Sequence, residues 1–260
     1  MTVQHYDWSA YHSNVRPNKI AIRDLSNNQT LTYKELDDRA NKLAHWLQAN
    51  GVKKGDRIAI LSQNCAEFFE LEFACAKTGS VELPLNWRLT KPELEYILND
   101  STPHALIYDE SFSDIAIELT KDCNIQSSLQ IDKKDASSQY EEAIKDSDAS
   151  YEKVDCTQDD LIMIMYTSGT TGHPKGAMIN HQMQLYNVIN LAAPAFVGPD
   201  TVQLVALPLF HTGGMNCYAN PVLHAGGEII LIREFDPGLA LSILGNADYG
   251  VSHFFAVPAP

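Results

Sequence analysis

A glycine-rich segment at 166–176, YTSGTTGHPKG, carries the residue types that hold a dense phosphate anion. Glycines let backbone N–H groups approach an anion closely, because no Cβ intrudes. Hydroxyl groups add hydrogen-bond donors and metal contacts, and Lys175 adds a mobile positive charge. The segment therefore predicts a loop that binds pyrophosphate. The hydroxyl and glycine positions that would form it are Thr167, Ser168, Gly169, Thr170, Thr171 and Gly172.

The surroundings of this segment separate it from better-known phosphate motifs. It follows the apolar run 161–165, which predicts a buried strand, and ligands of parallel α/β sheets bind at the carboxyl ends of strands. It is not the common P-loop, since Pro174 precedes Lys175 and Gly176 follows it. The alternative is a surface turn rich in Gly, Ser and Thr, but the length, the strand and the lysine favour the binding loop. His173 is expected to be exposed and without a role.

A second candidate group is His211-Thr212-Gly213-Gly214, which follows the apolar run VALPLF. The spacing and context favour a functional role for His211, and the alternative is a polar residue that caps the helix after it. Gly213 and Gly214 leave room for a substrate or allow close helix packing, and the sequence does not separate these two interpretations.

Strand and helix signals alternate along the chain, and this alternation predicts the α/β class, with layered, largely parallel sheets and flanking helices. Capping-box patterns predict helices that begin after Thr32 and Thr90, and a helical pattern resumes near His181. A further helix at 66–77 has apolar residues expected in the core, namely Phe68, Phe69, Leu71 and Phe73. Strands are expected at 57–61, 80–83, 105–108, 161–165, 202–206, 228–232 and 252–256, and the polar stretch 124–160 is expected to hold one short strand and one helix at the surface.

The composition excludes several classes of partner. A net charge of −14 argues against nucleic acid and anionic membrane surfaces, which both demand a basic face. The first residues lack the pattern of a signal peptide, and no apolar stretch is long enough to span a bilayer. Five cysteines without a CxxC pair predict reduced thiols in a cytoplasmic protein rather than a disulfide frame or a zinc site.

The motif YTSGTTGHPKG closely resembles the signature of the adenylate-forming (AMP-binding) enzymes, which include acyl-CoA synthetases, peptide-synthetase adenylation domains and luciferases. The resemblance extends over essentially the whole chain, because LTYKELDDRANKLAHWL, GVKKGDRIAIL, VELPLNWRLTKPEL and LPLFHTGGM are similar to family segments in the family's order. The HTGG run resembles the fatty acyl-CoA synthetase branch most.

The resemblance implies a two-step reaction in which a fatty or related hydrophobic carboxylic acid attacks ATP, expels pyrophosphate, and then passes from the acyl-adenylate to the thiol of CoA. It implies that Thr167 is a ligand of Mg²⁺ or phosphate and that Lys175 neutralises pyrophosphate. It also implies that His211 lies beside the acyl carboxylate or gates the acyl tunnel. The residues implied to wrap the β- and γ-phosphates are Ser168, Gly169, Thr170, Thr171 and Gly172.

The chain departs from the family by ending at Pro260, before the adenine and ribose motifs and the C-terminal lid with its catalytic lysine. We therefore expect an incomplete N-terminal adenylation domain, with a first α/β subdomain over about 1–190 and the start of a second over about 191–260. Such a chain is expected to be incomplete for catalysis. Two alternatives stay open: an adenylating enzyme with a carrier-protein acceptor, and a truncated, non-catalytic nucleotide-binding module.

Overall fold

The computed structural model describes residues 7–132, 138–167 and 172–257, which divide into two compact units. The first consists mainly of Asp38–Ser62 and Phe68–Gln182. The second consists of Trp8–Asp37, Gln63–Glu67 and the chain from Met183 onward. Each unit has its own sheet, and the chain moves between them more than once.

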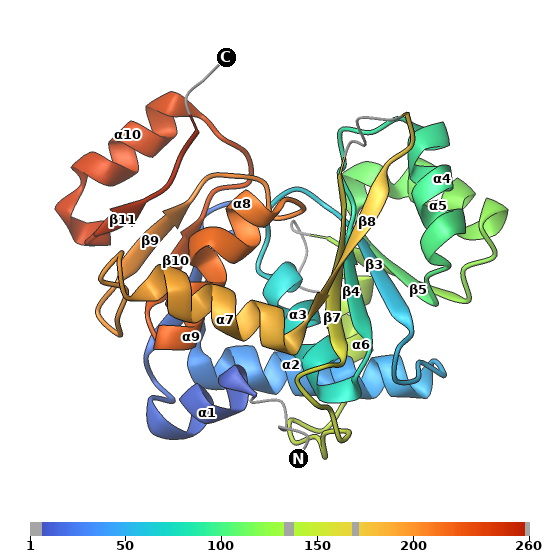
Figure 1. The fold of residues 1–260 in the computed structure, drawn as a ribbon, viewed down its shortest axis with the longest axis horizontal. Coiled ribbons are helices and arrows are strands. Elements are labelled where there is room, and N and C mark those ends of the chain that lie inside the picture. The colour runs from blue at the N-terminus through green and yellow to red at the C-terminus, as the bar shows by residue number, and fades with distance from the viewer. Residues whose placement is uncertain (1–6, 133–137, 168–171, 258–260) are drawn as a thin grey trace. The chain divides into compact units, whose positions relative to one another are not determined.

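The first unit is built on a six-stranded sheet in the order β6-β5-β3-β4-β7-β8 (Figure 1). All neighbours pair in parallel except β7 and β8, which run antiparallel. The mixed α/β architecture with mostly parallel strands confirms the predicted fold class. The strands are β3 Arg57–Leu61, β4 Val81–Pro84, β5 Ala105–Asp109, β6 Ser127–Ile131, β7 Leu161–Thr167 and β8 Lys175–Asn180.

Helices α4 and α5 cover one face of this sheet and bury an apolar cluster against β3, β4 and β5 (Figure 1). Residues Phe68, Phe69, Leu71 and Phe73 of α3 are buried, as predicted for core positions. The helices that lie wholly in this unit, or almost so, are α3 Glu67–Thr78, η1 Glu110–Phe112, α4 Lys91–Ser101, α5 Ser113–Asp122 and α6 Gln139–Lys145, with most of α2 Tyr33–Ala49.

Both predicted capping boxes are confirmed. The Glu93 carboxylate accepts hydrogen bonds from the backbone N–H and hydroxyl of Thr90, at 2.8 and 2.7 Å, at the start of α4. Glu35 accepts the same pair of bonds from Thr32, both at 2.8 Å, at the start of α2. These contacts satisfy backbone donors that a helix N-terminus leaves without intrahelical partners.

In the part of the acidic stretch 124–160 that the structure describes, there are one strand, β6, and one helix, α6, as predicted. A partly buried ionic network attaches α6 to helices α2 and α3. Arg39 of α2 donates to both carboxylate oxygens of Glu141, at 2.6 and 3.0 Å, and also to Glu70 of α3 at 2.7 Å. The hydroxyl of Tyr140 donates to the other oxygen of Glu70 at 2.7 Å. Such paired, multiply bonded charges hold a polar segment in place without a large apolar face.

The second unit contains a five-stranded sheet in the order β11-β9-β10-β1-β2. Helix α10 packs on one face, over Leu204 of β9 and Ile230 of β10 (Figure 1). The strands are β1 Ile20–Asp24, β2 Gln29–Thr32, β9 Val202–Val205, β10 Glu228–Leu231 and β11 His253–Phe254. The helices are α1 Trp8–Val15, α7 His181–Ala192 (most of it), α8 Thr212–Gly214, η2 Met215–Ala219, α9 Asn220–Ala225, α10 Pro237–Gly245 and η3 Ala247–Tyr249.

Several elements do not appear among the expectations from sequence: α1, the β1–β2 hairpin, α5 and β8. Strand β8 is an example of why such elements are missed. Its burial does not alternate, and its apolar Met178 is 63% exposed, so the sequence carries no strand periodicity there. None of the helices within the described residues is both long and apolar enough to cross a lipid bilayer.

Strand β4 contains a buried acid, Glu82, whose side chain is fully inaccessible to solvent. Among the described residues neither of its carboxylate oxygens has a hydrogen-bond partner. Burial, and next the nearby carboxylate of Glu72, raises the pKa of Glu82 well above its ordinary value. The folded unit therefore holds Glu82 in its protonated form, since a charge there would be desolvated.

We expect Glu82→Gln to raise the melting temperature at pH 8 and to lose this advantage at pH 5. A raised folded-state pKa contributes stability that is complete below the unfolded-state pKa and is lost as the pH rises towards the folded-state value. Gln is neutral at every pH, so the variant does not lose stability in this way. Each kcal/mol gained in the free energy of unfolding raises the melting temperature by about 2–4 °C for a protein of this size. Thermal melts at pH 5, 6.5 and 8 measure the difference. Glu152→Gln, at an exposed position, is the matched control and should show no such trend.

Candidate functional site

The β7–β8 hairpin positions the predicted phosphate loop. Strand β7 is paired with β4 on one side and with β8 on the other, and three of its residues, Ile162, Met163 and Met165, are buried. The last pair of the β7–β8 ladder joins Thr167 to Lys175. Directly opposed residues of an antiparallel pair have Cα atoms about 4.5–5.5 Å apart. The ladder therefore places the predicted metal or phosphate ligand beside the predicted phosphate-neutralising lysine.

Both of these side chains are exposed, as a site for a soluble anion requires. Within the described residues Lys175 makes no ion pair, so its charge is available to a ligand. Gly172 has φ +108, a backbone conformation that residues with a Cβ rarely adopt, which explains a glycine at this point of the loop. Four of the predicted phosphate-binding residues, Ser168, Gly169, Thr170 and Thr171, lie outside the described residues.

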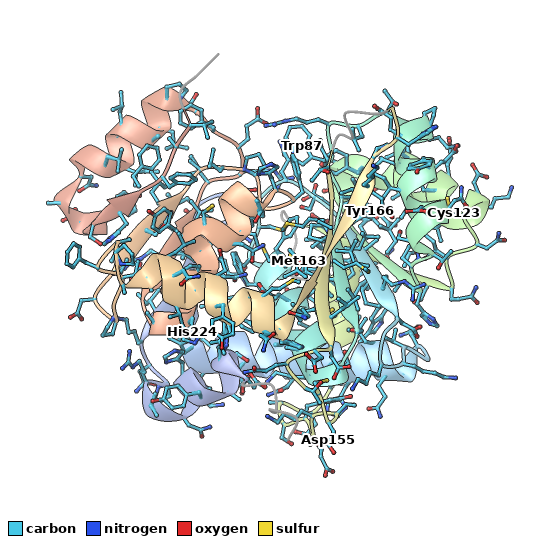
Figure 2. The ribbon with its side chains drawn as sticks, viewed as in Figure 1. Trp87, Cys123, Asp155, Met163, Tyr166 and His224 are labelled. Carbon is cyan, nitrogen blue, oxygen red and sulfur yellow. The ribbon has the colours of Figure 1, made fainter. Side chains whose placement is uncertain are left out.

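Two contacts join the loop segment to α4, and neither is expected from the sequence. The hydroxyl of Tyr166 donates to Asp100 at 2.5 Å, and Figure 2 shows this tyrosine extending from the hairpin towards α4. Burial, and next the bond to Asp100, raises the pKa of the Tyr166 phenol above its ordinary value, so the phenol stays a hydrogen-bond donor. His173 is exposed, as predicted, but it stacks on Tyr96, with ring centroids 4.9 Å apart and 21° between the planes.

The sequence contains one signal of these contacts, which is the spacing of Tyr96 and Asp100. Four residues apart on a helix, they lie on one face; Asp100 is exposed, whereas Tyr96 is half-buried and also packs against the apolar cluster that contains Leu94, Ile97 and Leu98. This spacing alone does not identify the partners of a polar helix face, because Asp100 and Tyr166 are 66 residues apart in the chain.

The second candidate group lies in the second unit. His211 is the N-cap of α8, and its Nδ1 accepts a hydrogen bond from the backbone N–H of Gly213 at 3.0 Å. The bond means that Nδ1 is unprotonated and that the ring proton sits on Nε2. The capping role that was the alternative for His211 is thus present in the fold, and a role towards a substrate stays a prediction.

The two glycines of this group differ. A Cβ on Gly214 would lie 2.2 Å from the carbonyl oxygen of Pro208, so close packing by itself requires glycine there. A Cβ on Gly213 would lie 3.2 Å from Nδ1 of His211, which is tighter than an ordinary contact, so the imidazole would have to shift by a few tenths of an ångström. Thr212 is exposed at the start of the helix.

The described residues contain no group of three or more His, Cys, Asp or Glu side chains that could hold a metal ion. Magnesium commonly binds through one or two protein groups together with substrate phosphates and water. The exposed hydroxyl of Thr167 fits that pattern as a single protein ligand, whereas a cage made only of protein groups does not.

A sequence profile of the family described as AMP-binding enzyme matches residues 9–259. A feruloyl-CoA synthase of Amycolatopsis sp is 35% identical over 251 residues, which cover 96% of this chain and 48% of that protein. The long-chain-fatty-acid–CoA ligase FadD13 of Mycobacterium tuberculosis is 32% identical over 235 residues, covering 88% of this chain and 45% of that protein. The chain thus spans about half the length of the curated relatives it matches.

Solved structures give the same result. ATP-bound MatB from Rhodopseudomonas palustris has a TM-score of 0.84 at 30% identity, over 93% of this chain and 48% of that one. The inhibitor-bound N-terminal domain of FACL13 from Mycobacterium tuberculosis has a TM-score of 0.84 at 29% identity, over 98% of this chain and 63% of that one. The chain therefore belongs to the AMP-binding enzyme family and corresponds to the N-terminal part of its acyl-CoA ligase members.

Proposed function

We propose that this chain is part of an ATP-dependent acid–CoA ligase that activates a fatty or related hydrophobic carboxylic acid. The acid carboxylate attacks the α-phosphate of ATP and forms an acyl-adenylate with loss of pyrophosphate, and the thiol of CoA then displaces AMP to give the thioester. The observation that carries the proposal is the pairing of Thr167 with Lys175 at the exposed end of the β7–β8 ladder. It supports binding of the pyrophosphate part of ATP.

In this proposal the chain's own residues neutralise and position phosphates. Lys175 supplies a positive charge towards the leaving pyrophosphate, and backbone amides of the loop supply donors, because such preorganised groups stabilise charge as it develops. The residues assigned to the β- and γ-phosphates are Ser168, Gly169, Thr170, Thr171 and Gly172. Thr167 is the proposed protein ligand of Mg²⁺, which would offset phosphate charge when bound.

The substrate end is assigned to the segment from His211 to Gly214, with His211 beside the acyl carboxylate. Support for a hydrophobic acid comes from relatives named for ferulate, indoleacetate and long-chain fatty acids. None of the five cysteines, which all lie within the described residues, forms a disulfide bond, and this supports a cytoplasmic location.

A second candidate differs in the acceptor thiol. A fatty acid–[acyl-carrier-protein] ligase, ScoC of Streptomyces coeruleorubidus, is 31% identical over 255 residues. The same adenylation step could therefore deliver the acyl group to a carrier protein. Offering CoA and a phosphopantetheine-bearing carrier protein in separate thioester assays distinguishes the two acceptors.

Pyrophosphate exchange tests the adenylation step directly. The complete product of the gene that encodes this chain should exchange labelled pyrophosphate into ATP in the presence of its acid. A panel of a long-chain fatty acid, ferulate, indoleacetate and acetate covers the chemistry of the relatives. If the complete protein exchanges pyrophosphate with no acid of this panel and with no other acid, the proposal is contradicted. A non-catalytic nucleotide-binding module is then the better account.

Replacing Lys175 with Ala should weaken binding of pyrophosphate and ATP by about tenfold to hundredfold, the range expected for one lost charge-assisted hydrogen bond. The melting temperature should stay unchanged, because the side chain is exposed and packs little. Titration calorimetry of the 260-residue chain measures its affinity for pyrophosphate and for ATP. Lys153→Ala removes the same charge from another exposed position and should bind as wild type does.

Variants of His211 separate its two roles. His211→Asn keeps a side-chain acceptor for the Gly213 N–H, whereas His211→Ala removes it and should reduce the free energy of unfolding by about 1 kcal/mol. If His211 also acts beside the acyl carboxylate, both variants should slow exchange in the complete enzyme. Full exchange by the stable Asn variant would show that His211 only caps α8.

A further inference from the structure

Helix α4 contacts the hairpin at both arms of the phosphate loop. Before the loop, the Tyr166 hydroxyl donates to Oδ2 of Asp100 at 2.5 Å. After it, the imidazole of His173 stacks on the ring of Tyr96 with centroids 4.9 Å apart. Helix α4 thus contacts Tyr166, which precedes the loop, and His173, which lies near its end.

Gly176 determines where the Tyr166 ring can lie. The two residues are a directly opposed pair in the β7–β8 ladder. A Cβ on Gly176 would lie 3.2 Å from Cε2 and from Cζ of the tyrosine, so the ring lies across the backbone of the opposite strand. From there its hydroxyl reaches Asp100. An aromatic ring over a glycine is a known way to stabilise a strand pair at a sheet edge.

Helix α4 is itself fixed in place. Its N-terminus has the Thr90–Glu93 capping box, and Leu94, Ile97 and Leu98 are buried in the apolar core. Tyr96 and Asp100 are therefore held by a fixed helix and contact His173, which is exposed, and Tyr166, which is half-buried. A functional group on a rigid element can hold a less packed neighbour in one geometry.

We propose that Tyr96 and Asp100 are positioning residues that hold the two arms of the phosphate loop at the spacing that pyrophosphate binding needs. This inference rests on the proposed function of the loop. Its physical basis is preorganisation: a loop whose ends are already fixed loses less conformational entropy when the anion binds. The alternative is that the two contacts only attach the hairpin to the helix, in which case their loss lowers stability and leaves affinity unchanged.

Titration of the 260-residue chain with inorganic pyrophosphate and with ATP, each with Mg²⁺, tests the inference. Tyr166→Phe and Asp100→Ala should each weaken pyrophosphate binding by about tenfold, the effect of one hydrogen bond to a charged group. The double variant should be no weaker than either single variant, because both remove the same bond. Asp100→Asn keeps an acceptor oxygen and should restore most of the affinity.

The stacking contact has its own pair of variants. Tyr96→Leu should weaken pyrophosphate binding and remove the ring-current shift of the His173 protons in the NMR spectrum, whereas Tyr96→Phe should retain both properties. Asn99→Ala, at the neighbouring exposed position of α4, is the control and should bind as wild type does. A thermal melt of each variant separates lost stability from lost affinity.

The outcomes distinguish this inference from the proposed function. Wild-type affinity in every folded variant, with a lowered melting temperature only, would overturn the positioning role and leave the loop's function intact. A wild-type chain that binds neither pyrophosphate nor ATP would overturn both. Weakened binding with unchanged melting temperature, rescued by Asp100→Asn and Tyr96→Phe, is the expected result.

Discussion

The antiparallel return of β8 along β7 is the constraint on which the candidate site depends. A parallel strand would need a long crossover before it paired again, but an antiparallel strand can return at once. The ladder therefore ends at the pair of Thr167 and Lys175. The segment that connects these two residues begins and ends at neighbouring positions of the hairpin. Burial of β7 in the sheet fixes one side of this pair, and hydrogen bonding in the ladder fixes the other. The pairing of β7 in the sheet thus determines the positions of Thr167 and Lys175.

The second unit shows a different relation between packing and chemistry. His211 uses one ring nitrogen to cap α8, and this bond determines which nitrogen carries the proton. A residue can therefore be required for the fold and still present its remaining nitrogen to a ligand, so the capping and substrate interpretations do not exclude each other. Gly214, by contrast, is explained by the carbonyl of Pro208 alone, and its identity says nothing about a substrate.

The sequence predicted what local patterns encode. Capping boxes predicted the starts of α2 and α4, alternation predicted the α/β class, and the apolar run before the glycine-rich segment predicted strand β7. Contacts between distant segments left no such pattern. The stacking of His173 on Tyr96 joins residues in separate elements, and the Arg39 network that anchors α6 depends on side chains from three helices. Strand β8 was missed because the register of its pairing with β7, rather than any alternation of its own, makes it a strand.

The charge of the chain explains why geometry matters so much at this loop. A protein with a net charge of −14 does not attract polyphosphate through its overall field. In the proposed function, binding therefore depends on short-range groups, among which the exposed ammonium of Lys175 lies within the described residues. Hydrogen bonds to an anion weaken steeply when distance or angle departs from the optimum. The contacts from Tyr166 to Asp100 and from His173 to Tyr96 lie on the two sides of this loop. If the loop binds pyrophosphate as proposed, such contacts let an acidic chain hold a site for a highly charged anion in a fixed geometry.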